Sequence, residues 1–101
     1  MKTILITGAS RGIGAATALL AARWGYAVSV NYYKNQPAAN AVVSQITENG
    51  GQAVAVQADA TREADILRLF TETERLLGPV HALVNNAGIL EPQMRVEDMT
   101  A

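Results

Sequence analysis

The residues of this sequence best suited to binding chemistry lie near its amino end, in the segment Thr7-Gly8-Ala9-Ser10-Arg11-Gly12-Ile13-Gly14. Glycines stand at positions 8, 12 and 14, between a short apolar run and a segment with helical spacing. A glycine lacks the β-carbon that would keep a ligand away from backbone N–H groups, and the first N–H groups of a helix carry partial positive charge. This pattern is typical of a loop that binds phosphate groups, such as the pyrophosphate of a dinucleotide.

Each glycine of this loop has its own expected role. We expect Gly8 to permit a sharp exit from the preceding strand, Gly12 to let a cofactor lie against the turn, and Gly14 to let the helix pack closely on the sheet. An ordinary tight turn would also use glycines, but the position between a strand and a helix favours the phosphate loop. The neighbouring residues expected to contact the cofactor are Ser10, Arg11 and Ile13.

The apolar residues along the chain predict strands and helices in turn. Short β-branched or apolar runs predict buried strands, and apolar residues three or four positions apart predict helices bounded by glycine, proline or capping residues. This alternation predicts βαβ units with right-handed crossovers, and hence an α/β fold with a parallel sheet and helices on both faces. The predicted strands are 4–6, 27–30, 53–56 and 80–84, and the predicted helices are 13–24, 37–49 and, after an N-cap at Thr61, 62–77.

Several side chains have an expected place in this fold. Phe70 follows the apolar stripe of the third helix and is expected in the core. His81, the only histidine, lies among apolar residues of the fourth strand, where a solvated or internally bonded side chain is favoured over a catalytic base. In the first helix, the stripe expected to face the core consists of Ile13, Ala16, Leu20 and Trp24, with Ala21 beside them.

Composition excludes several classes of protein. Eight basic and nine acidic residues among 101 leave a net charge of −1, so nucleic acid is not an expected partner. The chain has no cysteine and one histidine, which excludes disulfides and a metal site with the usual zinc ligands. No apolar run approaches the roughly 20 residues that cross a bilayer, so no membrane contact is expected and the predicted location is cytoplasmic.

The spacing Gly-x-x-x-Gly-x-Gly at Gly8, Gly12 and Gly14, together with Asn85-Asn86-Ala87-Gly88 after the fourth strand, resembles the classical subgroup of the short-chain dehydrogenase/reductase family. An aspartate after the third strand, Asp59, adds to this resemblance, which covers the whole chain. The resemblance implies a Rossmann-type doubly wound parallel sheet with strand order 3-2-1-4 in the portion present. It also implies a nicotinamide cofactor bound across the ends of the strands.

The resemblance further implies roles for the strand-end residues. Asp59 would accept a hydrogen bond from the adenine amino group, with Ala60 beside it, although Asp59 with Thr61 would equally serve to cap the third helix. Of the two asparagines, one would tie neighbouring strands together and one would line the cofactor ribose, and the sequence leaves open which does which. The members of this second motif expected at the cofactor are Asn85, Asn86, Ala87 and Gly88.

The end of the second strand, Val30-Asn31-Tyr32-Tyr33-Lys34, bears on the choice of cofactor. An acidic side chain there binds the ribose hydroxyls of NAD, whereas the 2′-phosphate of NADP would be repelled by it. This segment has the neutral Asn31 and the basic Lys34, and Arg11 stands nearby in the loop, so NADP(H) is favoured over NAD(H). An Asn31→Asp change is expected to move the preference toward NAD. Tyr33 is expected to contact the cofactor, although Tyr32 and Tyr33 would also serve to cover the sheet.

Classical members of this family transfer a proton with a tyrosine, a lysine four residues later, a serine and an asparagine. No Tyr-x-x-x-Lys pattern is present here, so we expect these groups beyond Ala101, in a longer protein of which residues 1–101 are the N-terminal part of one NAD(P)-binding domain. The expected function is hydride transfer between an alcohol and a carbonyl in a small-molecule substrate, by a full-length homo-oligomer. The 101-residue chain alone is expected to be inactive. A non-catalytic NADP(H)-binding module and an inactive truncated fragment are the alternatives.

Overall fold

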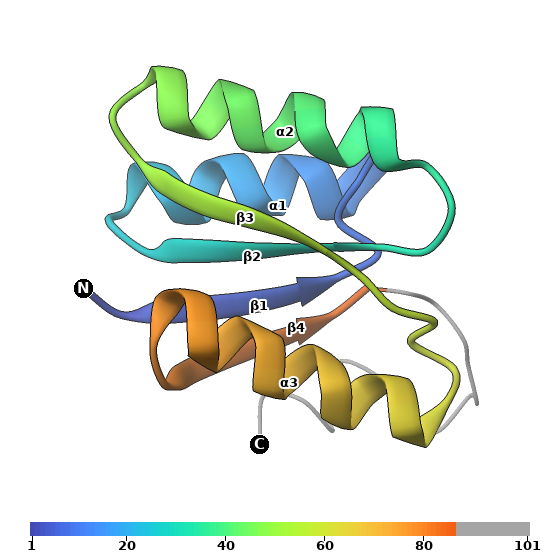
Figure 1. Ribbon diagram of the computed structural model, residues 1–101. Helices are drawn as coiled ribbons and strands as arrows, with labels where there is room; N and C mark the ends of the chain where they lie inside the picture. The colour runs from blue at the N-terminus through green and yellow to red at the C-terminus, as the bar shows by residue number, and fades with distance from the viewer. Residues whose placement is uncertain (87–101) are drawn as a thin grey trace.

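The computed structural model describes residues 1–86, so the predicted contributions of Ala87 and Gly88 lie outside the described residues (Figure 1). Every predicted strand and helix is present, and no end differs from the predicted position by more than two residues. The elements are β1 (Thr3–Thr7), α1 (Gly12–Arg23), β2 (Ala27–Tyr32), α2 (Gln36–Glu48), β3 (Gln52–Gln57), α3 (Glu63–Leu77) and β4 (Val80–Asn85).

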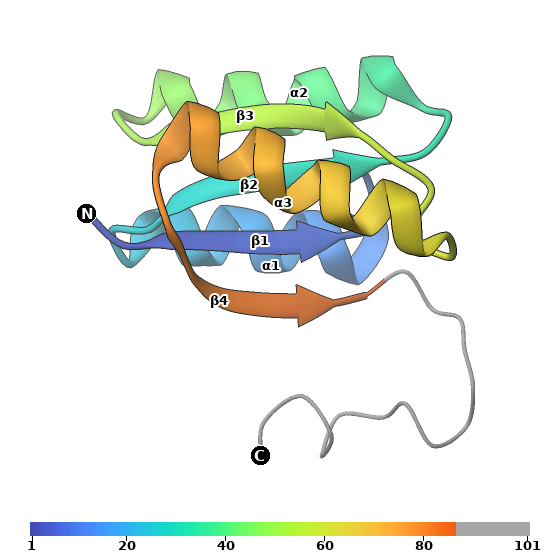
Figure 2. The ribbon, with the colours of Figure 1, turned by 60° about the horizontal axis from the view of Figure 1, so that its bottom comes forward.

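The four strands form one parallel sheet in the order β3-β2-β1-β4, which confirms the predicted topology. The helices α1 and α2 lie side by side on one face of the sheet, and α3 covers the other face (Figures 1 and 2). Each of β1, β2 and β3 is followed by a helix that returns the chain to the same edge, so all four strands end at the same side of the sheet. This arrangement brings the loops after the strands together.

Apolar side chains fill both sides of the sheet. Ile4 and Ile6 of β1 pack under α1 and α2, whereas Leu5 between them packs with Leu69 of α3. All five residues of β1 are buried, as expected for a parallel strand with helices on both faces. The partly buried Phe70 joins the cluster under α3, which confirms its predicted place against the core.

The buried face of α1 differs from the predicted one. Ile13 and Trp24, predicted to lie in the core, are 76% and 73% exposed, and Leu20 is also exposed. The residues that face the sheet are small, namely Gly14, Ala18 and Ala21. Small side chains let a helix approach a sheet closely, and the larger Ile13, Leu20 and Trp24 are exposed instead. The predicted core role of the stripe through Ile13 and Trp24 is thus wrong, and only its flanking residue Ala21 is buried.

Polar groups fix the ends of the helices and their contacts with the sheet. Asn35 caps α2, because its Oδ1 accepts a hydrogen bond from the Ala38 N–H at 3.0 Å. Between the sheet and α3, the hydroxyls of Ser29 and Thr73 are fully buried and share a hydrogen bond of 2.7 Å. Within residues 1–86, no helix combines the length and apolar character needed to cross a membrane.

Candidate functional site

A cleft of about 700 Å³ lies where β1 and β2 end, beside the end of β4. The helix α1 carries the chain from β1 to β2 across one face of the sheet, whereas α3 carries it to β4 across the other face (Figure 2). The connections on the two sides of β1 therefore separate at this edge, which is where open α/β sheets bind their ligands. The cleft is lined by Gly8, Ser10, Arg11, Gly12, Ile13, Tyr32, Tyr33, Lys34, Asn35 and Asn86.

The backbone of the predicted phosphate loop has the conformation that its glycines allow. Gly8 and Gly12 have φ values of 60° and 62°, in the left-handed region that side chains other than glycine rarely adopt. Arg11 precedes α1 in an extended conformation, and no side chain among the described residues caps the helix. The N–H groups of Gly12 and Ile13 have no acceptor within the helix, because they belong to its first turn. They are available to an anion in the cleft.

Gly14 is required for a different reason, because neighbouring atoms lie too close to leave room for a β-carbon. A β-carbon at Gly14 would collide with the Gly8 carbonyl oxygen and would lie 2.7 Å from Asn86 Nδ2. The sequence predicted close packing of this helix against the sheet. The structure shows that the tightest contact is with the loop after β1 and the residue after β4.

The two asparagines at the end of β4 have separate places. Asn85 Oδ1 accepts a hydrogen bond of 2.8 Å from the Thr7 hydroxyl, which ties β4 to β1. The Asn86 N–H donates to the same Thr7 oxygen at 2.8 Å, and the Asn86 side chain lines the cleft. The structure therefore distinguishes what the sequence left open, because Asn85 joins the strands and Asn86 borders the cleft.

Asn31 does not lie in the cleft, contrary to the prediction that it contacts the cofactor. Its side chain is 2% exposed, and its Oδ1 accepts from the Gly8 N–H at 3.1 Å. Val30 packs under α1 and α2, so the next residue along the strand points to the opposite face of the sheet. Tyr32, one position further, borders the cleft instead. The expected shift of cofactor preference on Asn31→Asp stays a prediction.

Asp59 accepts hydrogen bonds within the turn that precedes α3. Its Oδ1 accepts hydrogen bonds from the Thr61 hydroxyl at 2.6 Å and from the Thr61 N–H at 3.0 Å. These bonds hold the pKa of Asp59 below its ordinary value. The predicted N-cap, Thr61, belongs instead to the turn that Asp59 closes, and the N-cap of α3 is Arg62. Neither Asp59 nor Ala60 lines the cleft, and the adenine contact expected of Asp59 stays a prediction.

Positive charge borders the cleft. Arg11 and Lys34 are its charged lining residues, and the Lys34 ammonium lies 5.3 Å from the centre of the Tyr33 ring. In the described part of the chain, no acidic side chain lines the cleft. Asn35 also lines the cleft and was missed by the sequence reasoning, although an asparagine shortly before Pro37 is a recognisable N-cap signal. The amino ends of α1 and α2 both border this space, so the cleft favours an anion.

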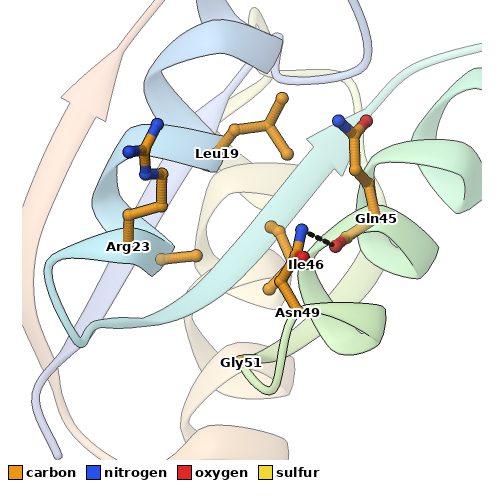
Figure 3. Close-up of a pocket in the computed structure, with 7 residues that line it drawn as sticks. Leu19, Arg23, Gln45, Ile46, Asn49 and Gly51 are labelled. Atoms are coloured by element: carbon orange, nitrogen blue, oxygen red, sulfur yellow. Dashed lines mark hydrogen bonds between the residues drawn. The ribbon is translucent and has the colours of Figure 1, made fainter.

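A second cavity of about 480 Å³ lies between the carboxyl ends of α1 and α2 (Figure 3). Leu19 and Ile46 form apolar parts of its wall, with Arg23 and Gln45 at its margin. The carboxyl ends of helices present carbonyl groups with partial negative charge, which disfavours a diphosphate. This cavity is therefore a poorer place for a dinucleotide than the cleft at the phosphate loop.

His81 is bonded within the protein, as predicted. The Thr3 N–H donates to His81 Nδ1 at 3.3 Å, near the starts of β1 and β4. The strands separate this position from the cleft, which lies at their other ends. His81 therefore has no place in the candidate site.

Comparison with known proteins agrees with this geometry. The family model of the short chain dehydrogenases matches residues 2–101. An uncharacterized oxidoreductase, YgfF of Escherichia coli (strain K12), is 50% identical over the whole chain, which covers 41% of that protein. A 3-oxoacyl-[acyl-carrier-protein] reductase of Synechocystis sp. (strain ATCC 27184 / PCC 6803 / Kazusa) is 46% identical over 99% of the chain and 42% of its own length.

A solved structure shows the same fold. The dehydrogenase/reductase from Sinorhizobium meliloti 1021 superimposes with a TM-score of 0.84 and 42% sequence identity, over 94% of this chain and 39% of that one. The chain thus spans about two fifths of the length of the relatives that it matches. The chain belongs to the short chain dehydrogenase family, whose members named here are oxidoreductases.

Proposed function

We propose that this chain is the cofactor-binding part of an NADP(H)-dependent oxidoreductase that interconverts an alcohol and a carbonyl compound. The observation that carries the proposal is the cleft at the end of β1, with its uncapped helix and its glycine backbone. The name of the Synechocystis relative, a 3-oxoacyl reductase, supports a carbonyl group as the site of reaction.

The described residues fit a dinucleotide at this place. The N–H groups of Gly12 and Ile13 would hold the pyrophosphate, and the absence of a β-carbon at Gly14 keeps the loop in the required position. Asn86, which lines the cleft, would border a ribose. When bound, the nicotinamide supplies or accepts the hydride. The role of this chain is then to bind the cofactor and orient it.

The charges of the cleft support NADP(H) over NAD(H). A 2′-phosphate carries nearly two negative charges near neutral pH, as phosphate monoesters do. Arg11 and Lys34 line the cleft together with Tyr32, the last residue of β2, and within residues 1–86 no acidic side chain lines it. Arginine is suited to a phosphate because its planar guanidinium can donate two parallel hydrogen bonds.

The chemistry of the substrate requires residues that this chain does not supply. None of its three tyrosines is followed by lysine at the fourth position, so we place the proton-transferring groups in the part of the relatives' length that the chain does not span. We accordingly propose that residues 1–101 bind cofactor without turnover. The homo-oligomeric state of the full-length protein stays a prediction.

Calorimetric titration of the 101-residue chain with NADPH and NADH tests this function. We expect NADPH to bind more tightly than NADH. Arg11→Gln or Lys34→Gln should weaken the binding of NADPH by about tenfold and change the affinity for NADH little, because a hydrogen bond to a charged group contributes about 1.5–3 kcal/mol. Arg23→Gln is the control, since Arg23 borders the other cavity. Tighter binding of NADH would refute the cofactor preference, and binding of neither nucleotide would refute the function.

A further inference from the structure

The carboxamide of Asn31 is buried at the end of β2 and is bonded through both of its polar atoms. The Gly8 N–H donates to its Oδ1 at 3.1 Å, and its Nδ2 donates to the carbonyl oxygens of Val56 and Ala58, each at 3.2 Å. A third carbonyl, that of Tyr32, lies 3.2 Å from the same nitrogen. An amide has two N–H hydrogens and one carbonyl oxygen, so this side chain is fully satisfied inside the protein.

These bonds join the phosphate loop, which lines the cleft, to the segment before Asp59, the residue predicted to contact the adenine. Gly8 belongs to the phosphate loop, and Ala58 directly precedes the Asp59 turn. The main chain reinforces both contacts, because the Ala9 N–H donates to the Asn31 carbonyl at 2.8 Å and the Ala58 N–H donates to the Tyr32 carbonyl at 3.0 Å. The end of β2 is thus held between the phosphate loop and the segment after β3.

Gly8 is fixed on both of its sides by this arrangement. Its N–H is bonded to Asn31, and its carbonyl lies against Gly14 at the start of α1. A loop anchored in this way cannot turn its free N–H groups without breaking the hydrogen bond between the Gly8 N–H and Asn31. The anchor is specific for an amide, because a carboxylate could still accept from Gly8 but could not donate to the carbonyls of Val56 and Ala58.

We propose that Asn31 is a positioning residue, which sets the phosphate loop at a fixed distance from the end of β3 and so aligns the two ends of the dinucleotide site. The inference rests on the proposed cofactor function. Asn31 touches no ligand, and its effect is transmitted through Gly8 on one side and Ala58 on the other. A dinucleotide spans both ends of the site, so its affinity depends on their alignment. The affinity of a ligand that occupies one end alone does not depend on that alignment.

The first test uses amide hydrogen exchange of the 101-residue chain without cofactor. In the wild type, we expect the Gly8 N–H to exchange at least about tenfold more slowly than the N–H of Gly12, because only Gly8 has a protein acceptor. Asn31→Ser, whose hydroxyl cannot span both segments, is expected to remove this protection while the Leu5 N–H in β1 stays protected. Equal exchange at Gly8 and Gly12 in the wild type would overturn the proposal, and this result needs no variant to fold.

The second test compares a ligand of both ends with a ligand of one end. We expect Asn31→Ser to weaken the binding of NADPH by about tenfold or more, since each lost buried bond corresponds to a factor of roughly ten in an equilibrium constant. The affinity for adenosine 2′-monophosphate should change by less than about threefold. Ser29→Ala is the matched control, because Ser29 is a buried polar residue of the same strand bonded to Thr73 and not to the loop. It should lower stability and leave both affinities unchanged.

The outcomes separate this proposal from the proposed function. If the wild type binds NADPH and Asn31→Ser binds it equally well, or loses both ligands to the same extent, the positioning role is refuted and the cofactor function stands. If the wild type binds no NADPH, the cofactor function fails, and the exchange rate of Gly8 still decides whether Asn31 anchors the loop.

Discussion

Replacing Gly14 with alanine probes the closest contact of the candidate site. An ideal β-carbon at this position would lie 2.7 Å from Asn86 Nδ2 and 2.9 Å from the carbonyl carbon of Gly8, and still closer to the Gly8 oxygen. The neighbours at Gly8 are backbone atoms, which cannot rotate away as a flexible side chain can. Either α1 or the phosphate loop must therefore move.

The expected cost follows from two opposing effects. Alanine is favoured over glycine within a helix by at most about 1 kcal/mol, whereas overpacking of a tight site costs about 1–3 kcal/mol. We therefore expect Gly14→Ala to lower the free energy of unfolding by about 1–2 kcal/mol, which corresponds to a fall in Tm of roughly 5–15 °C for a domain of this size. Displacement of the loop should also weaken NADPH by about tenfold to a hundredfold, through the loss of N–H bonds to phosphate.

The assay is thermal unfolding followed by circular dichroism, together with calorimetric titration of NADPH below the transition. Gly25→Ala is the matched control, because Gly25 has a φ of 96° and no atom within 4 Å of an added β-carbon. It should lower stability through backbone strain and leave the affinity for NADPH unchanged. A Gly14→Ala variant as stable as the wild type, with normal NADPH affinity, would refute the reasoning.

Three further predictions concern the fold around the cleft. Ser29→Ala should lower the free energy of unfolding, measured in urea, by about 1–3 kcal/mol, because it leaves the buried Thr73 hydroxyl without its partner at 2.7 Å. Adding Thr73→Val should recover part of that loss, and losses that simply add would contradict the hydrogen bond. Leu69→Ala should lower the free energy of unfolding by about 2–5 kcal/mol in the same assay, because Leu69 is fully buried under the sheet, and a loss below 1 kcal/mol would contradict its packing. The Asp59 carboxyl, followed by NMR, should titrate with a pKa below its ordinary value. Its stabilising effect is present above the pKa of an unfolded aspartate and should disappear as the pH falls through the pKa of the folded state. Thr61→Ala should raise the pKa of Asp59, and an unchanged pKa would contradict the bonds from Thr61.

The order of elements was predictable because its signals are local. Gly25 and the pair Gly50-Gly51 follow helices at the points where the chain turns back, and both glycines at 25 and 50 have positive φ values. The strands read as short, largely apolar runs, and β1 and β2 are buried on both faces, so their existence did not depend on knowing which side each residue faces. The parallel sheet then followed from the right-handed crossovers, whereas the strand order was implied by the family resemblance.

The buried face of α1 was not predictable from periodicity. Ile13 and Trp24 have helical spacing, but the same helix carries a second stripe of small residues through Ala18 and Ala21, and this stripe meets the sheet. Hydrophobicity favours the stripe with large residues, whereas close packing of helix on sheet favours small ones. Only the three-dimensional contact decides between the two.

The place of Asn31 was missed for a related reason. Side chains along a strand alternate between its faces, so an error of one position exchanges a cleft residue for a buried one. Tyr32 borders the cleft and Asn31 lies on the other side, beneath the segment that follows β3. The same alternation separates Asn85 from Asn86. The motif identified the region, and the register of the strand ends assigned the individual residues.

The measurement that most directly tests the binding of a dinucleotide diphosphate at the phosphate loop is a titration of the ¹⁵N-labelled chain with NADPH, followed by the chemical shifts of the backbone amides. We expect the largest shifts at Gly12, Ile13 and Gly14, whose N–H groups stand at the uncapped start of α1. Shifts concentrated instead at Leu19 and Ile46, in the cavity between the helix carboxyl ends, would contradict the assignment.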